Sequence, residues 1–212
     1  MRQLFSVDTF WGRFWIPGDA PYDAIMDSMI HGRVFDHPVI QAAMPFLTPG
    51  CCAIDIGANF GQYTIIFHGA VKQGGGKVIS VEAEPDVAAG LRKTITERHL
   101  ENEIELHEKA AGARSGEKVT FPEITFYEYP TYGSYGIIPN GNPGCRLVET
   151  LAIDDLDIKQ QVSFIKIDVQ GYDLFALEGC KRTIKKNRCA VMFELEAGLA
   201  SQWGHYPEDY WR

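Results

Sequence analysis

Short apolar runs alternate along this chain with longer stretches whose apolar residues recur at helical spacing. Short runs rich in Ile and Val are typical of buried strands, whereas apolar residues repeated every three or four positions indicate amphipathic helices. The predicted strands lie at residues 52–56, 77–82, 104–107, 164–168 and 190–194. Helices are predicted at about 61–71, from Pro85 onward, and after Asp168 as one helix with Leu174, Leu177 and Ile184 inward.

This alternation predicts an α/β fold, a parallel sheet covered by helices on both faces and joined by right-handed crossovers. The chain has 212 residues, which is enough for one domain with a core of its own. We expect the sheet domain to occupy residues 49–212, with residues 1–48 as an N-terminal extension.

The extension has two predicted parts. Residues 1–20 contain a cluster of rings that indicates a short hairpin packed on the main body, and residues 21–48 carry the spacing of two helices. Trp11 and Trp15 would stack on a ligand or, in the interpretation we favour, pack against the protein, since such rings bury a large area.

Residues 113–150 interrupt the alternation. The segment is rich in tyrosine, glycine and proline and is too long for a simple connector, so we expect it to contribute substrate contacts. Its aromatic part, 126–139, favours a flat or ring-shaped substrate.

Acidic residues stand at the ends of four predicted strands: Asp55, Glu82, Asp168 and Glu194. Ligands of parallel α/β sheets bind beyond the carboxyl ends of the strands. Four acids at equivalent positions suit a cationic ligand with several hydroxyl groups, and Glu82 is placed to bind the two hydroxyls of a ribose.

The first strand runs into Asp55-Ile56-Gly57-Ala58-Asn59-Phe60-Gly61. A strand, a glycine turn and a helix can bring backbone N–H groups to a ligand at the helix N-terminus. The spacing is G-x-x-x-G rather than the G-x-G-x-x-G of dinucleotide sites. Without further support, an ordinary turn between strand and helix would explain it too.

Composition excludes several function classes. The formal net charge of −8 argues against nonspecific nucleic-acid binding and against a polybasic membrane anchor. The five cysteines form no C-x-x-C pair, so neither a disulfide framework nor a zinc site is indicated. With no apolar run near the length of a membrane span, we expect a soluble cytoplasmic protein.

Four blocks together resemble the FkbM family of methyltransferases that use S-adenosylmethionine (SAM), and they occur in the family's order. They are residues 55–64, 81–85, 148–156 and 165–173. The resemblance implies a Rossmann-like methyltransferase fold. It also implies O-methylation of a hydroxyl group on a small molecule or a sugar.

The resemblance also implies roles for individual residues. Those expected to contact SAM are Asp55, Gly57, Asn59, Phe60, Gly61, Tyr63, Glu82, Ala83, Ala110 and Asp168. Within this set, the acid-glycine turn would hold the amino-acid end, Glu82 the ribose, and the Ala110-Ala111 segment would lie near the adenine. For a general base, Asp168 is the first candidate, followed by His205 and Glu194. A metal held by Asp168 and Glu194 has no ligand spacing to support it.

The chain departs from the family in two places. Where the family usually has Asp-Val-Glu-Gly, this chain has Gln170, which weakens a role for that position as a base or metal ligand. The family's class also adds two strands beyond the fifth, and the residues after Glu196 hardly fit both. We therefore expect either a truncated chain or a partner, such as a second copy, on the edge of the fifth strand.

Two other functions are compatible with this pattern. One is a NAD-dependent oxidoreductase on the same fold, which the glycine spacing and the lack of a Tyr-x-x-x-Lys pair disfavour. The other is a catalytically inactive protein that keeps the SAM fold for binding alone.

Overall fold

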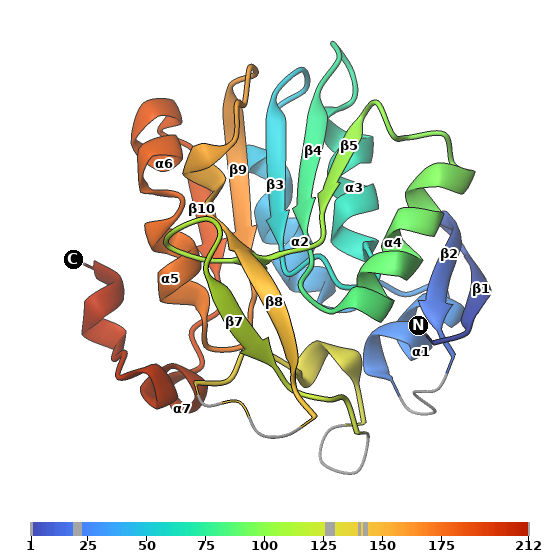
Figure 1. Cartoon of the computed structure of the whole chain (residues 1–212). Helices are drawn as coiled ribbons and strands as arrows, with labels where there is room; N and C mark the ends of the chain where they lie inside the picture. The colour runs from blue at the N-terminus through green and yellow to red at the C-terminus, as the bar shows by residue number, and fades with distance from the viewer. Residues whose placement is uncertain (1, 19–22, 126–129, 140, 142–143, 212) are drawn as a thin grey trace.

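The computed structural model describes residues 2–18, 23–125, 130–139, 141 and 144–211 (Figure 1). Residues 126–129 of the predicted aromatic insertion lie outside this part, as do Asn140, Asn142 and Pro143. Among the described residues, no helix is long and apolar enough to span a membrane.

A five-stranded parallel sheet forms the centre of the molecule, which confirms the predicted fold class (Figure 1). Its strands follow the order β10-β9-β3-β4-β5. They are β3 (Cys52–Ile56), β4 (Lys77–Val81), β5 (Ile104–His107), β9 (Val162–Ile167) and β10 (Ala190–Phe193). These bounds agree closely with the apolar runs of the sequence.

Helices cover both faces of this sheet. The apolar residues of α3 (Gln62–Val71) and α4 (Pro85–Glu97) pack with Ala53, Val78 and Phe164 on one face. On the other face, α5 (Asp173–Glu178) and α6 (Lys181–Asn187) pack with Ile54 and Ile165. Adjacent residues of a strand thus enter different cores, as the twofold alternation of a strand requires.

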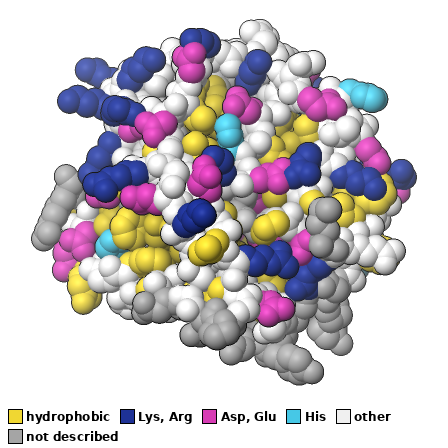
Figure 2. Space-filling model, viewed as in Figure 1, with side chains coloured by type: hydrophobic (Ala, Val, Ile, Leu, Met, Phe, Trp, Pro, Cys, Tyr) yellow, Lys and Arg dark blue, Asp and Glu magenta, His cyan; other side chains and the backbone are white. Residues whose placement is uncertain are grey.

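The helix predicted after Asp168 is wrong in one respect, because two short helices stand in its place. The chain turns at Gly179, where a Cβ atom would overlap the carbonyl oxygen of Gly112. Figure 2 shows Lys and Arg side chains gathered at the upper left, where Figure 1 places α6. Lys185 and Lys186 lie in the last turn of that helix, where cations offset the partial negative charge of its C-terminus.

The N-terminal extension contains the predicted hairpin, β1 (Leu4–Thr9) with β2 (Gly12–Pro17). The hairpin packs on α4, where the Trp15 amide donates to Thr94 Oγ1 at 2.9 Å and Lys93 Nζ lies 3.2 Å from the centre of the Trp15 ring. The predicted packing is therefore confirmed for Trp15, and Trp11 lies partly buried against the core, whereas Phe5 and Phe10 are exposed. The helices α1 (Ala24–Ile30) and α2 (His37–Ala43) follow, and the 3₁₀ turn η1 (Met44–Phe46) ends the extension.

The described part of residues 113–150 contains regular secondary structure. A second sheet forms from β6 (Ala110–Ala111), β8 (Arg146–Leu151) and β7 (Lys118–Phe121), in that order. β8 is not among the predicted strands, although Val148 and Thr150 turn inward and Leu147 and Glu149 turn outward in the alternation of a strand. Two 3₁₀ turns, η2 (Tyr132–Ser134) and η3 (Ile153–Asp155), flank β8.

Beyond the edge strand β10, the chain continues as helical turns: α7 (Ala197–Ala200), η4 (Ser201–Trp203) and η5 (Pro207–Trp211). The Tyr210 ring stacks on Phe193 with 5.3 Å between their centres. In the part of the chain that the structure describes, β10 pairs with β9 alone.

Candidate functional site

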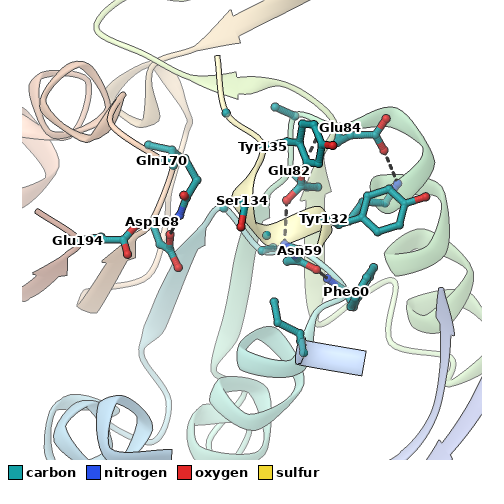
Figure 3. Close-up of a pocket in the computed structure, with 18 of the residues that line it drawn as sticks. Asn59, Phe60, Glu82, Glu84, Tyr132, Ser134, Tyr135, Asp168, Gln170 and Glu194 are labelled. Atoms are coloured by element: carbon teal, nitrogen blue, oxygen red, sulfur yellow. Dashed lines mark hydrogen bonds between the residues drawn. The ribbon is translucent and has the colours of Figure 1, made fainter. Parts of the chain in front are cut away.

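A cavity of about 360 Å³ lies at the carboxyl ends of the central strands. Its size is in the range of small-molecule sites, and its position is where parallel α/β sheets bind ligands. Its wall combines the turn after β3, the end of β4, the ends of β9 and β10, and the segment from Thr131 to Ile137 (Figure 3).

The turn after β3 is shaped by contacts between parts of the chain. Gly57 has φ +74° and Gly61 has φ +85°, values that favour glycine. A Cβ atom on Gly57 would overlap the carbonyl oxygen of Asp168, and one on Gly61 would overlap the side chain of Leu91. These glycines therefore let the turn approach β9 and α4. Gly57 still borders the cavity, whereas Gly61 does not line it.

Glu82 follows β4 and faces the cavity (Figure 3). Its two carboxyl oxygens each accept a backbone N–H at 2.8 Å, one from Asn59 and one from Glu84. Burial raises the pKa of Glu82 to about 7, although both of these hydrogen bonds favour the ionised form. Each oxygen of a carboxylate can accept more than one hydrogen bond, so Glu82 can also bind two hydroxyl groups.

Asp55 does not line the cavity, so the structure does not support its predicted direct contact with a ligand. It alternates with Ile54 and Ile56 and therefore points to the α3 face, where it is buried. Oδ2 accepts the Thr64 hydroxyl at 2.6 Å, and Oδ1 lies 3.5 Å from Lys166 Nζ, beyond normal hydrogen-bonding distance. Burial raises the pKa of Asp55, while Lys166 opposes that shift.

Lys166 connects this buried acid to the cavity wall. Its Nζ donates to the Gly57 carbonyl oxygen at 3.0 Å and lies 3.4 Å from Asp168 Oδ2. Burial by itself would raise the pKa of Asp168, but Lys166 and hydrogen bonds hold it below its usual value. Lys166 is not among the predicted site residues. A lysine inside an apolar strand was a usable signal, because buried cations are almost always paired.

Asp168, Gln170 and Glu194 form a connected group at the other side of the cavity (Figure 3). The amide nitrogen of Gln170 donates to Asp168 Oδ1 at 3.1 Å and to Glu194 Oε2 at 2.9 Å. Partial burial and the neighbouring charge of Asp168 raise the pKa of Glu194 to about 8. The pKa of Glu194 is thus shifted upward and that of Asp168 downward, so Asp168 is the more readily ionised of the two.

The remaining predicted residues divide into two sets. Those that line the cavity are Asn59, Phe60, Tyr63, Ala83 and Ala110. His205 does not line it, because its ring packs on Phe175 with 4.6 Å between the ring centres. The structure thus does not bring His205 together with the other candidates for a general base. Trp11 and Trp15 also lie away from the cavity.

Two segments far apart in the sequence both line the cavity, namely Ala24–Ile25 at the start of α1 and Thr131–Ser134; we call them the roof. The Tyr132 ring meets the edge of Phe60 at 5.8 Å between centres. Substrate contacts were predicted in 113–150, but a connection of this segment with α1 was not. Within the described ranges, no group of three or more His, Cys, Asp or Glu side chains is arranged to hold a metal ion.

The family model described as the methyltransferase FkbM domain matches residues 55–211. The chain is also similar to the crystal structure of methyltransferase FkbM from Methylobacillus flagellatus KT, at 22% identity and a TM-score of 0.46. That alignment covers 68% of this chain and 32% of the other, so this chain spans about a third of that protein's length.

Two further structures show similarity. One is precorrin-6y C5,15-methyltransferase from Geobacter metallireducens GS-15, with 15% identity, coverage of 84% of this chain and 73% of that chain, and a TM-score of 0.44. The other is a SAM-dependent methyltransferase from Aquifex aeolicus, with 18% identity, coverage of 37% and 40%, and a TM-score of 0.31. A search of curated protein sequences finds no match.

Proposed function

This chain belongs to the FkbM methyltransferase family, and we propose that it transfers a methyl group from SAM to a hydroxyl group of a small molecule or sugar. The observation that carries the proposal is the geometry at Glu82. A carboxyl group at the end of the second strand, oriented by the amides of Asn59 and Glu84, suits the vicinal hydroxyls of a ribose.

The charge of the cavity wall supports SAM rather than NAD. The acidic residues that line it are Asp36, Glu82, Glu84, Asp168, Glu194 and Glu196, and the basic ones are Lys109 and Lys166. Lys109 is paired with Glu149, and Lys166 with Asp168. Even without Glu82 and Glu194, whose pKa values are raised, the acids outnumber the lysines, and this favours a cationic sulfonium over the anionic pyrophosphate of a dinucleotide. We do not favour the oxidoreductase alternative for this reason.

When bound, SAM supplies an electrophilic methyl group on a positively charged sulfur. Glu82 would hold the ribose, Ala83 and Ala110 would contribute to the adenine site, and the Gly57–Phe60 turn would hold the remainder of the cofactor. Asp55 supports this turn indirectly rather than through contact with the ligand. It lies beside Lys166, whose Nζ donates to the Gly57 carbonyl oxygen.

Asp168 is the proposed proton acceptor. With its pKa held below the usual value, Asp168 is ionised at neutral pH, whereas the raised pKa of Glu194 makes it the member of the pair that retains a proton more readily. The side chain of Asp168 is 41% exposed and borders the cavity, so a hydroxyl group can reach it. A weak base suffices, because the hydroxyl oxygen becomes strongly acidic as it gains the methyl group.

Gln170 supports this assignment. A glutamate at this position would place a third carboxyl group beside Asp168 and Glu194, and mutual repulsion would raise the pKa values of the group. The neutral amide instead donates to both acids and keeps Asp168 oriented and ionised.

The test is methyl transfer from labelled SAM to a panel of sugars and phenols, with wild-type protein and Asp168→Asn compared at several pH values. We expect labelled methyl ethers, and a loss of about 100-fold in turnover for Asp168→Asn with a much smaller change in affinity for S-adenosylhomocysteine (SAH). SAH binding without transfer to any acceptor would favour the inactive binding protein. Equal turnover in Asp168→Asn would remove Asp168 as the base.

A further inference from the structure

Asp23 is a buried acid at the beginning of α1, and none of its surface is exposed. Its carboxyl group accepts four hydrogen bonds, and its two oxygens serve different segments. Oδ1 accepts the amides of Ile25 and Met26 at 3.0 and 2.9 Å, which caps the helix. An aspartate at the start of a helix needs only this cap for a structural explanation.

Oδ2 makes contacts that capping does not require. It accepts the Thr131 hydroxyl at 2.9 Å and the Tyr132 amide at 2.9 Å. These residues lie more than 100 positions further along the chain. One carboxyl group therefore joins the two segments of the roof. Four hydrogen bonds to one fully buried carboxyl group fix its position, which makes this junction firm.

The roof that Asp23 joins lies close to the turn after β3. A Cβ atom on Gly133 would lie 3.2 Å from Ile25 Cδ1 and 3.5 Å from Asn59 Nδ2. Gly133 therefore lies close to both α1 and the turn after β3. Tyr132 packs against Phe60 at the same place. A displacement of Thr131–Ser134 would open the cavity above Asn59 and Phe60.

We propose that Asp23 is a positioning residue that holds the roof closed over the bound cofactor. It does so by joining the start of α1 to Thr131 and Tyr132. Asp23 itself does not line the cavity and acts through the roof residues that do. The inference rests on the proposed SAM site, and it adds a residue outside the family's sequence blocks that controls how long the cofactor stays bound.

The experiment separates the two roles of Asp23, namely capping α1 and binding Thr131 and Tyr132. Asp23→Ser keeps one oxygen to cap α1 but loses the second oxygen that reaches the roof. Thr131→Val leaves Asp23 intact and removes the hydroxyl that donates to it. The matched control is Asp27→Ser in the same helix, because Asp27 is exposed and contacts Arg33 rather than the roof. SAH affinity and dissociation rate are measured by calorimetry and stopped flow, with amide hydrogen exchange of residues 131–135.

We expect Asp23→Ser to bind SAH about 10-fold more weakly, mainly through faster dissociation, and Thr131→Val about 3-fold more weakly. Exchange at Tyr132 and Gly133 should accelerate in Asp23→Ser, while Asp27→Ser matches wild type in every readout. SAH binding that is equal in wild type, Asp23→Ser and Thr131→Val would overturn the inference. A wild-type protein that binds no SAH would instead contradict the proposed function.

Discussion

At the scale of single residues, the carboxyl group of Glu82 is held in place by the protein before it serves a ligand. Two backbone amides fix its orientation, and burial raises its pKa to about 7. A group with this pKa changes its charge near physiological pH. Ribose hydroxyls that donate to it favour its ionised form, so ligand binding and proton release are coupled.

We therefore expect SAH affinity to rise as the pH increases from 5.5 to about 7 and to level off above that. In the free protein the raised pKa keeps Glu82 protonated at pH 5.5, and binding must remove that proton at a cost of up to about 10-fold in affinity per pH unit. Glu82→Gln, which cannot ionise, should bind more weakly with less pH dependence. Calorimetry across this range checks both, and a flat wild-type profile would contradict the assignment of Glu82.

At the scale of elements, the turn between β3 and α3 depends on the absence of side chains at particular positions. Gly57 meets the Asp168 carbonyl oxygen, and this contact sets the distance between the turn and the end of β9. The approach brings Lys166 Nζ to the Gly57 carbonyl oxygen. The turn and the proposed base are therefore parts of one packed unit.

Gly57→Ala should destabilise the protein by about 3 kcal/mol or more, because the new methyl group overlaps backbone and the residue has a left-handed conformation. Gly69→Ala is the matched control. Gly69 lies in α3, where an added methyl group would contact no other element within 4 Å, and the substitution should stabilise by about 0.5–1 kcal/mol. Urea unfolding measures both, and a Gly57→Ala protein of wild-type stability would contradict the contact.

At the scale of the whole molecule, the sheet gathers the acidic side chains at one rim although they come from separate segments. Parallel strands place their carboxyl ends together, so Glu82, Asp168 and Glu194 share one cavity. The rim is acidic, which favours a cationic ligand. The prediction of a partner on the edge of β10 stays a prediction.

A thermal-shift comparison tests this selectivity on the intact protein. SAH at about 100 times its Kd should stabilise the fold by about 2.7 kcal/mol, or about 5–10 °C in Tm for a domain of this size. NAD at the same concentration should leave Tm unchanged, since the rim repels its pyrophosphate. A larger shift with NAD than with SAH would contradict the SAM site.

The sequence alone determined the central strands, the helices α3 and α4, the N-terminal hairpin, and the positions of the acids at strand ends. Each of these features depends on the periodicity of apolar residues or on a turn formed by neighbouring residues. Such local patterns decide which side chains a strand or helix can bury. The family blocks likewise identified the Gly57 turn and Glu82.

Only the tertiary structure decided which of these residues face the cavity. Asp55 points to α3 because of strand alternation, Gln170 joins Asp168 to Glu194, and His205 packs on Phe175. The roof is the clearest case, because Asp23 and Thr131 meet across 108 positions of sequence. The physical reason is that such a contact depends on how separate elements pack, and no local pattern of polar and apolar residues records that packing.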